Sequence, residues 1–257
     1  MDYLSINKQA WNKRTQIHLE SKFYDVEGFK KGQSSLNPIE LEQLGNVTGK
    51  SLLHLQCHFG QDTLSWARRG AKVTGVDLSA DAIMQANLLA QSLALEANFI
   101  ESDIYQFGQD NQQQFDLVFT SYGAICWLPD LIEWAKVIAK SLKVGGEFHM
   151  VEFHMFNDLL SGMRYFPNGQ ADVDQEGTYT ENCDGTQSTI VTWSHSLSEV
   201  INALIGAGLN IESLNEYPYS PYECFDDLEY VQGFGYQKLY QNQQVPLLYS
   251  VKAIKSQ

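Results

Sequence analysis

The sequence predicts an α/β fold in which a mostly parallel sheet is covered by helices on both faces. From Ser51 onward, apolar runs of four or five residues alternate with longer segments of helical periodicity. That alternation is typical of a parallel sheet buried on both sides, and right-handed crossovers make it doubly wound, an α/β/α sandwich. With 257 residues, 44% of them hydrophobic, the chain can bury one large core. We therefore expect a single domain spanning residues 1–257.

Residues 1–45 are expected to form a helical cap on this domain. Residues 3–23 carry apolar side chains at loosely helical spacing, namely Tyr3, Leu4, Ile6, Trp11, Ile17 and Leu19. A turn-rich segment that reaches Pro38 is expected to follow.

Residues 50–154 are expected to form the core of the sheet. The predicted strands are LLHL (52–55), KVTGV (72–76), NFI (98–100), DLVFT (116–120) and EFHMVEF (147–153). The predicted helices between them cover residues 61–69, 79–95 and 130–142. Ligands of such sheets bind beyond the carboxyl ends of the strands, so the loops at that edge are where we expect the site.

The rest of the chain is expected to complete the sheet after one interruption. Residues 155–195 are rich in Gly, Asp, Asn and Thr and weakly periodic, which predicts an insertion over the active site with a hairpin around TYTENCDGTQSTIVTW. Residues 196–257 are expected to add a helix, SLSEVINALIGAGL, with Ser196 or Ser198 as its N-cap. The last two strands are predicted at 210–218 and 246–254.

The net charge of −14 disfavours nucleic acid and membrane surfaces as partners, and no run of lysines or arginines makes a local exception. The cysteines, Cys57, Cys126, Cys183 and Cys224, contain no CxxC pair, which argues against a disulfide framework and a zinc ribbon. The N-terminus MDYLSINKQAWNKR has no apolar signal region, and no stretch approaches 18 apolar residues. We expect a cytoplasmic protein, monomeric or dimeric.

The stretch LLHLQCHFGQDTL (52–64) runs from a predicted buried strand into a loop at the ligand edge. Asp77 ends the next strand, 17 residues after Gly60, where a carboxylate can accept both hydroxyl hydrogens of a ribose. Asp103 follows the third strand and is placed to meet the edge of an adenine ring. The sequence therefore predicts an adenosine-containing ligand at this edge.

Four stretches resemble, in order and spacing, the successive motifs of class I S-adenosylmethionine-dependent methyltransferases: LLHLQCHFGQDTLSWARRGAKVTGVDLS, FIESDIYQF, FDLVFTSYGAICWLPDL and LKVGGEFHMVEFH. Within that superfamily the chain resembles a bacterial group of small-molecule methyltransferases that share the QCHFG loop. The resemblance implies a Rossmann-like, seven-stranded sheet with an antiparallel last strand and S-adenosylmethionine as cofactor. The cofactor-binding candidates are Gln56, Cys57, His58, Gly60, Gln61, Asp62, Asp77, Leu78, Asp103, Ile104 and Ser121.

The loop departs from the pattern of that family. Where the family has an acidic residue and three glycines, this chain has His54, Gln56, His58 and Gly60. Glycine permits positive φ and close approach of the backbone to a ligand. We expect Gln56 and His58 either to adopt ordinary backbone angles or to bear strain of about 1–3 kcal/mol each.

Methyl transfer from a sulfonium needs alignment and exclusion of water, and an oxygen or nitrogen nucleophile can also need a base. Glu152 and His154 are two residues apart on a strand and so share a face. If that face meets the crevice, His154 is the candidate base, with Glu152 and Tyr122 as further catalytic candidates. A structural role for the Glu152–His154 pair is the alternative.

Aromatic side chains are expected to wall a substrate pocket or to pack in the core: Trp11, Tyr122, Trp127, Tyr165, Phe166, Tyr179 and Trp193. His195 is a second histidine that can reach the site from the insertion. The segment with Trp11 and His18 can fold over the cofactor as a lid and exclude water.

Three other functions compete with that of a methyltransferase acting on a small molecule. A metal site at His54, Cys57 and His58 is disfavoured by their spacing and by the lack of a second ligand cluster. A dinucleotide oxidoreductase shares the strand, loop and acidic residue, but the glycine fingerprint is missing. A protein that binds the adenosyl cofactor without catalysis remains an alternative, and the acceptor cannot be identified from the sequence.

Overall fold

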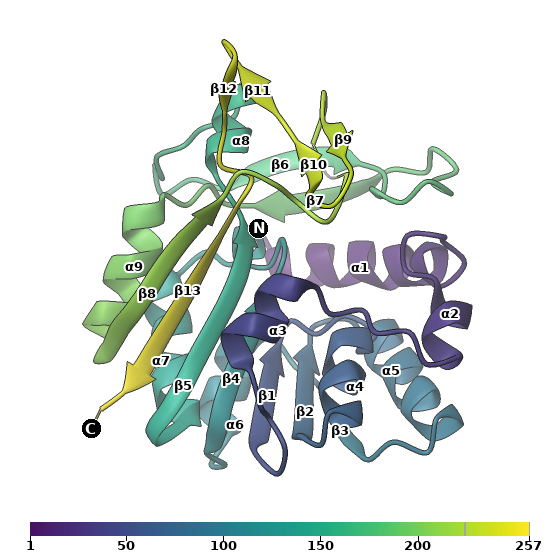
Figure 1. Ribbon diagram of the computed structural model, residues 1–257, viewed down its shortest axis with the longest axis vertical. Helices are drawn as coiled ribbons and strands as arrows, with labels where there is room; N and C mark the ends of the chain where they lie inside the picture. The colour runs from purple at the N-terminus through teal and green to yellow at the C-terminus, as the bar shows by residue number, and fades with distance from the viewer. Residues whose placement is uncertain (224, 257) are drawn as a thin grey trace.

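A computed structural model, which describes residues 1–223 and 225–256, shows a chain built around a seven-stranded sheet (Figure 1). The strand order is β3-β2-β1-β4-β5-β13-β8. Strands β1 to β5 pair in parallel, whereas β13 is antiparallel to both of its neighbours. These strands are β1 (Ser51–Leu55), β2 (Lys72–Asp77), β3 (Ala97–Glu101), β4 (Phe115–Ser121), β5 (Leu142–Phe153), β8 (Leu209–Tyr217) and β13 (Leu248–Lys255). The predicted doubly wound sheet with an antiparallel last strand is confirmed.

Helices cover both faces of this sheet (Figure 1). On one face lie α3 (Pro38–Leu44), α4 (Gln61–Arg68) and α5 (Ala80–Ser92); on the other lie α6 (Ile104–Asp110), α7 (Leu131–Ser141) and α9 (Leu197–Gly206). Because successive strand residues point to opposite faces, Leu52 packs in one cluster with Trp66 of α4, and Leu53 packs in another with Trp134 of α7. The alternation of buried strands and amphipathic helices thus produces two cores, one on each face.

The N-terminal helix α1 (Tyr3–Leu19) crosses above the carboxyl edge of the sheet, between α5 and the hairpin β6–β7 (Figure 1). Two asparagines hold it there. The side chain of Asn7 exchanges two hydrogen bonds with the backbone of Val191, at 2.7 and 2.9 Å. The Asn12 carbonyl oxygen accepts a hydrogen bond from the Ser79 hydroxyl at 2.7 Å. α1 lies in the segment expected to form the cap, and the segment predicted to be rich in turns also contains α2 (Val26–Lys30).

Two excursions leave the sheet, whereas the sequence predicted one. The first contains α8 (Phe156–Leu160) and the hairpin of β6 (Asp172–Glu176) with β7 (Ser188–Thr192). Its first strand begins before the stretch in which the hairpin was expected.

The second excursion separates β8 from β13 and forms two small hairpins, from β9 (Glu229–Val231), β10 (Gly235–Gln237), β11 (Leu239–Tyr240) and β12 (Gln243–Gln244). Strands of two or three residues are too short to show a period, which explains why the sequence did not reveal them. α6 and the 3₁₀ turn η1 (Ile125–Trp127) were also not predicted.

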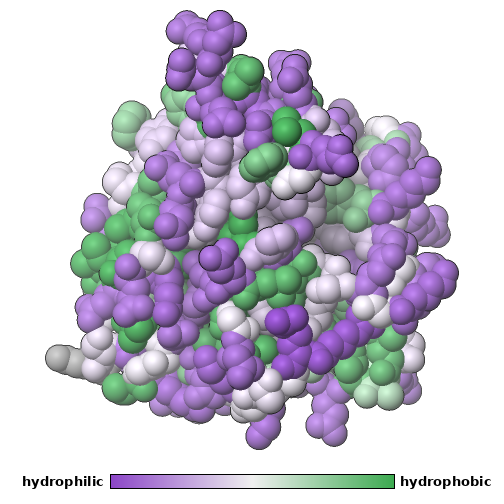
Figure 2. Space-filling model, in the orientation of Figure 1, coloured by the Kyte–Doolittle hydropathy of each residue, from purple (hydrophilic) through white to green (hydrophobic). Residues whose placement is uncertain are grey.

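Within the described part of the chain, no helix is both long and apolar enough to cross a bilayer. Three cysteines, Cys57, Cys126 and Cys183, have free thiols, and Cys224 lies outside the described residues. In the view of Figure 2 the surface is largely hydrophilic, with hydrophobic side chains gathered over α9 and β8 and a hollow below β9 and β10.

Candidate active site

A cavity of about 930 Å³ lies at the carboxyl ends of the first four strands, where the sequence predicted the ligand crevice. Its walls come from the sheet loops, from α1, from the hairpin of the first excursion and from the start of the second. Every predicted cofactor-binding residue lines it: Gln56, Cys57, His58, Gly60, Gln61, Asp62, Asp77, Leu78, Asp103, Ile104 and Ser121. The fold therefore brings those residues together around one space.

The loop after β1 keeps the backbone conformation of a glycine loop although two of its positions are not glycine. Gln56 has φ +58° and His58 has φ +50°, so both adopt the left-handed conformation. Each is held by a specific contact: the Gln56 amide donates to the Ala124 carbonyl at 2.6 Å, and the His58 N–H donates to the Asp77 carboxylate at 2.7 Å. Of the two expectations for this loop, the structure shows the strained one, and the contacts hold the strain in place.

Gly60 is the one position of the loop where space as well as φ requires glycine. It has φ +80°, and a Cβ there would lie 2.7 Å from the ring of Phe99. It also precedes α4 as its N-cap residue, so the N–H groups of the first turn of α4 face this side of the cavity. The loop thus offers backbone donors to an anionic group.

Asp77 links two loops at the end of β2. Its Oδ1 accepts the N–H of Ser79 at 2.8 Å, and its Oδ2 accepts the N–H of His58 at 2.7 Å. Burial raises its pKa to about 6. Each carboxylate oxygen has a second lone pair, so the group can still accept two hydroxyl hydrogens from a ligand.

Asp103 follows β3 and caps α6. Its Oδ1 accepts the N–H groups of Tyr105 and Gln106, both at 3.0 Å, while the carboxylate lines the cavity. Ile104, only 4% exposed, lies beside it. Asp77 and Asp103 therefore stand on neighbouring strand ends, as the sequence predicted.

The expected lid is in place over the cavity. Nδ1 of His18 on α1 lies 2.8 Å from Nε2 of His58, and the other nitrogen of His18 contacts the hydroxyl of Thr178 in the first excursion. Burial lowers the pKa of both histidines, that of His18 to about 3, so the pair is neutral. Trp11 packs edge-on against His58 at 5.2 Å. This chain of contacts joins α1, the cofactor loop and the insertion.

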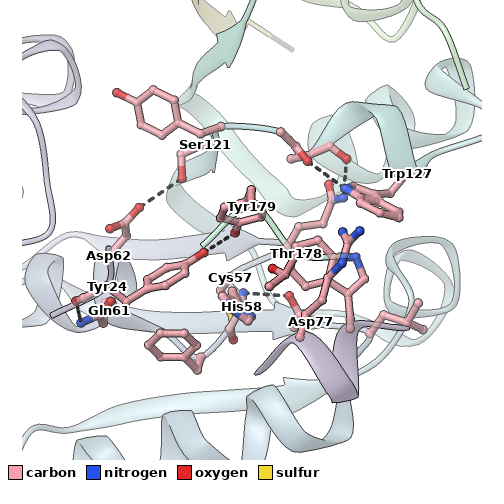
Figure 3. Close-up of a pocket in the computed structure, with 18 of the residues that line it drawn as sticks. Tyr24, Cys57, His58, Gln61, Asp62, Asp77, Ser121, Trp127, Thr178 and Tyr179 are labelled. Atoms are coloured by element: carbon pink, nitrogen blue, oxygen red, sulfur yellow. Dashed lines mark hydrogen bonds between the residues drawn. The ribbon is translucent and has the colours of Figure 1, made fainter. Parts of the chain in front are cut away.

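Asp62 and Ser121 lie at one end of the cavity in Figure 3, and Asp77 lies at the other. The Ser121 hydroxyl donates to the Asp62 carboxylate at 3.2 Å. Tyr122, the next residue, has φ +38°, and its hydroxyl donates to Glu40 of α3 at 2.9 Å. Tyr122 was predicted as a catalytic candidate, and it lines the cavity.

Neither Glu152 nor His154 lines the cavity. β5 ends at Phe153, so His154 lies past the strand, and its Nε2 contacts the Glu216 carboxylate of β8 at 2.8 Å. The Glu152 carboxylate is 2% exposed and accepts the N–H groups of the turn after β4, including that of Ala124 at 2.8 Å. The expected base is therefore turned away from the crevice, and Glu152 shapes the turn that carries Tyr122.

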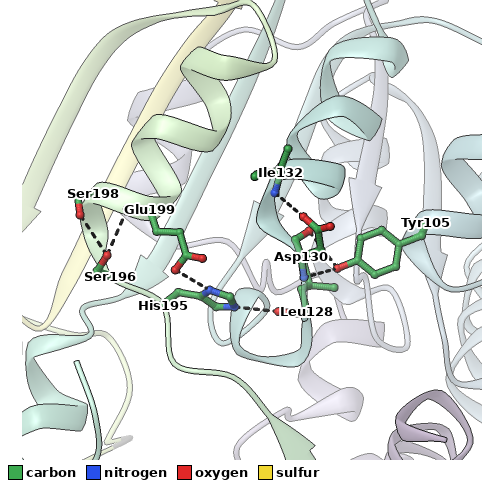
Figure 4. A network of polar contacts seen from close by, with 8 residues as sticks. All are labelled: Tyr105, Leu128, Asp130, Ile132, His195, Ser196, Ser198 and Glu199. Carbon is green, nitrogen blue, oxygen red and sulfur yellow. Dashed lines mark hydrogen bonds and ion pairs between the residues drawn. The ribbon is translucent and has the colours of Figure 1, made fainter. Parts of the chain in front are cut away.

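Several other sequence candidates also lie elsewhere. His195 contacts Glu199 through Nδ1 and the Leu128 carbonyl through Nε2, which connects α9 to the turn before α7 (Figure 4). Of the predicted aromatic wall, Trp11, Tyr122, Trp127 and Tyr179 line the cavity, whereas Tyr165, Phe166 and Trp193 do not.

The side chains considered as metal ligands point to different partners. His54 contacts the Thr63 hydroxyl at 2.8 Å, and His58 contacts His18. Among the residues described, no three His, Cys, Asp or Glu side chains are grouped as metal ligands would be.

Some residues of the cavity carried no signal in the sequence. Arg14 lies 5.3 and 5.4 Å from the ring centres of Trp11 and Trp127 and donates to the Gly177 carbonyl. Tyr24 follows α1, and Tyr222 comes from the second excursion. No local pattern distinguishes these positions, because each reaches the site through a tertiary contact.

Comparisons with known proteins agree with this architecture. Residues 52–146 match a family described as a methyltransferase domain. A ubiquinone biosynthesis O-methyltransferase from Klebsiella pneumoniae is 30% identical over 131 residues, 49% of this chain and 54% of that protein. The chain thus spans about half the length of the curated relatives it matches.

Two solved structures share the fold. An S-adenosylmethionine-dependent methyltransferase from Clostridium acetobutylicum superposes with a TM-score of 0.60 at 15% identity, over 96% of this chain and 98% of that one. One from Mesorhizobium loti superposes with a TM-score of 0.56 at 17% identity, over 88% and 99%. Residues 52–146 thus match a methyltransferase domain, and the chain shares its fold with solved S-adenosylmethionine-dependent methyltransferases.

Proposed function

We propose that this chain transfers the methyl group of S-adenosylmethionine to a small molecule. The observation that carries the proposal is the placement of Asp77 and Asp103 on adjacent strand ends of one cavity, with the strained loop between β1 and α4 beside them. Asp77 would accept the ribose hydroxyls, and Asp103 would face the adenine, with Leu78 and Ile104 against the ring. The match to a methyltransferase domain supports the same assignment.

The methionyl end of the cofactor would extend along the loop at Gln56, Cys57, His58 and Gly60. The N-terminus of α4 and the Arg14 guanidinium are placed to attract its carboxylate. Gln61 also lines the cavity there, and its amide donates to the Tyr24 carbonyl at 2.9 Å, which joins this loop to the segment after α1. We propose that, in the group of proteins with the QCHFG loop, contacts of the non-glycine residues hold a left-handed backbone conformation that glycine adopts without strain.

The acceptor would lie at the end of the cavity with Ser121 and Tyr122. The chain's own residues align it, exclude water through the α1 lid and provide a hydroxyl, that of Tyr122, near the reacting atoms. We further propose a cytoplasmic protein, monomeric or dimeric, that acts on neither nucleic acid nor membranes. The net charge of −14 and the free thiols among the described residues support that setting.

The test is a thermal and calorimetric titration with S-adenosylhomocysteine. A ligand at a hundredfold excess over its dissociation constant stabilises a folded protein by about 2.7 kcal/mol. The Asp77→Asn variant should lose most of the shift, because an amide replaces a charged acceptor at the ribose. For the wild type, affinity should fall as the pH drops below about 6, where Asp77 takes up a proton.

Absence of any shift in the folded wild-type protein would contradict the proposal. Binding of NADH in place of S-adenosylhomocysteine would favour an oxidoreductase. Binding of the adenosyl compound without transfer of labelled methyl to any component of a cell extract would favour a non-catalytic binding protein.

A further inference from the structure

The two ends of the cavity differ in chemistry. Asp77 lies at one end, and Asp62 and Ser121 lie at the other (Figure 3); Tyr122, the residue after Ser121, also lines the cavity. Under the function proposed above, the adenosine of the cofactor takes the first end, and its methionyl group extends along the loop toward the N-terminus of α4, where Asp62 lies. The second end is left for the acceptor, and its charges and rings indicate which class of molecule it suits.

Negative charge dominates the cavity wall. The carboxylates that line it belong to Asp25, Asp62, Asp77, Asp103, Glu176 and Glu223. Among the described lining residues, Arg14 is the one lysine or arginine, and it is already paired, with its guanidinium 3.5 Å from the Glu176 carboxylate. The cavity thus has an excess of negative charge that the protein itself does not balance.

Of these carboxylates, Asp62 faces the acceptor end. The Ser121 hydroxyl reaches it at 3.2 Å, and among the residues described it forms no ion pair. Burial raises its pKa, although hydrogen bonds from Ser35 and Ser121 favour the charged form. An ionised carboxylate away from water is costly unless a ligand supplies the opposite charge.

A second carboxylate lies behind the first. Glu40 is fully buried on α3; it accepts the Tyr122 hydroxyl at 2.9 Å and the Asn37 N–H at 2.8 Å. The same Asn37 donates to the Tyr222 hydroxyl at 2.8 Å. The two tyrosines that close this end of the cavity are therefore connected to a buried acid.

A continuous series of aromatic rings lines the same cavity as Asp62. Phe23 lies 5.0 Å from Tyr24, 5.6 Å from Tyr179 and 5.3 Å from Tyr222, between ring centres. Tyr222 in turn lies 5.0 Å from Tyr122. Rings of this kind attract an ammonium group through their negative faces, and the attraction grows when water is excluded.

We propose that the acceptor end of the cavity binds a small molecule carrying a protonated or quaternary amine, with Asp62 as its anionic partner and the rings of Phe23, Tyr24, Tyr122, Tyr179 and Tyr222 as its walls. The proposal rests on the methyltransferase function proposed above. The ammonium of the cofactor's own methionyl group has the same chemistry, so the experiment must separate the two sources.

Three probes with one phenol ring and different charges test this: tyramine, a cation; 4-methylphenol, neutral; and 4-hydroxyphenylacetate, an anion. Each is titrated by calorimetry into the full chain saturated with S-adenosylhomocysteine. Tyramine should bind at least about tenfold more tightly than 4-methylphenol, with the anion weakest, as expected for one hydrogen-bonded charge pair. Tetramethylammonium serves as a second cation without the ring.

Asp62→Asn should weaken tyramine by about tenfold or more and leave 4-methylphenol and S-adenosylhomocysteine unchanged, since only the charge pair is lost. Glu223→Gln is the matched control, because it removes the same charge from an exposed side chain on the cavity rim. That variant should change tyramine binding by less than about twofold, as expected where solvent screens the charge.

Equal or tighter binding of the neutral or anionic probe overturns the proposal, and so does failure of both cations to bind. If Asp62→Asn weakens S-adenosylhomocysteine instead of tyramine, Asp62 serves the cofactor and the proposal falls. Even if Asp62→Asn does not fold, the affinities of the wild type for the cationic, neutral and anionic probes still test the proposal. The titration with S-adenosylhomocysteine alone reports separately on the methyltransferase function.

Discussion

Gln56 shows how a single residue can keep the conformation of a glycine without being one. Its left-handed backbone would cost an ordinary residue about 1–2 kcal/mol. The hydrogen bond from its amide to the Ala124 carbonyl, at 2.6 Å, joins the loop after β1 to the turn after β4. The side chain therefore offsets the strain and couples two walls of the cavity.

At position 56 the glycine variant should be more stable than the alanine variant, which is the reverse of their order inside a helix. Both Gln56→Ala and Gln56→Gly lose the amide contact, but only glycine relieves the left-handed strain. We expect Gln56→Gly to be more stable than Gln56→Ala by about 1 kcal/mol in urea unfolding. At Gln85, inside α5, the same pair should show the usual order, with alanine more stable by roughly 0.5–1 kcal/mol. Equal stabilities at Gln56 would show that φ carries no cost there.

The sequence located the ligand loop but not the angles or the contacts within it. LLHLQCHFGQDTL predicted a strand, a loop and a helix start, because apolar runs and polar breaks are local. The sequence predicted that this strand ends at residue 153 but did not reveal that His154 turns toward Glu216, because that contact joins residues 62 positions apart. Contacts such as Tyr122 to Glu40, which are 82 residues apart, leave no local pattern to find.

Helix α3 connects the edge of the cavity to the buried carboxylate of Glu40. Glu40 on this helix is 0% exposed, and burial raises its pKa to about 7, with the nearby Asp62 carboxylate adding to the effect. Its capping box with Asn37 begins the helix, and its contact with Tyr122 anchors the helix to the sheet. One carboxylate thus sets both the start of α3 and its position.

The stability of Glu40→Gln relative to the wild type should depend on pH. The folded pKa is above the ordinary value of 4.5, so the wild type loses stability as the pH rises from 4.5 through about 7. The variant cannot ionise, and its advantage over the wild type should grow by roughly 2–3 kcal/mol between pH 5 and pH 8.

Urea unfolding at both pH values measures this, and any offset that is independent of pH cancels in the comparison. Glu42→Gln, on the exposed side of the same helix, is the control and should show no such change. A constant difference between Glu40→Gln and the wild type would mean that Glu40 ionises normally.

The larger elements could be predicted because their sequences show a hydrophobic pattern, and the smallest strands show none. Strands such as β1 and β4 are buried on both faces, and their sequences are mostly apolar. The strands β9 to β12 are short and mostly exposed; β9 pairs with β10, β11 pairs with β12, and Tyr236 of β10 also bridges to Ser220. Their sequences therefore carry neither a period nor an apolar face.

For the whole molecule, the important fact is that distant parts of the chain close one cavity. α1, the loop before β7 and the start of the second excursion all meet above the sheet edge. The match to a methyltransferase domain covers residues 52–146, so most of this roof lies outside it. Under the proposed function, the cofactor end would lie mostly within the matched residues and the roof over the acceptor mostly outside them.

Hydrogen exchange should report that closure. Binding of S-adenosylhomocysteine should slow amide exchange in α1 and in residues 177–181 more than in β8, because the lid contacts run through His18, His58 and Thr178. In Asp77→Asn under the same conditions the protection should be absent. Protection confined to the loops after β1 and β2 would show that α1 does not respond to the ligand.

The position of β13 has a consequence for how the protein is made. This strand is the last in the sequence, yet it lies between β5 and β8 and pairs with both. Strands β1 to β5 can assemble while synthesis continues, but β8 has no partner in the sheet until residues 248–255 leave the ribosome. Until then its unpaired edge can join another chain. The newly made chain is therefore open to association with other chains through this edge in the interval between the synthesis of β8 and that of β13.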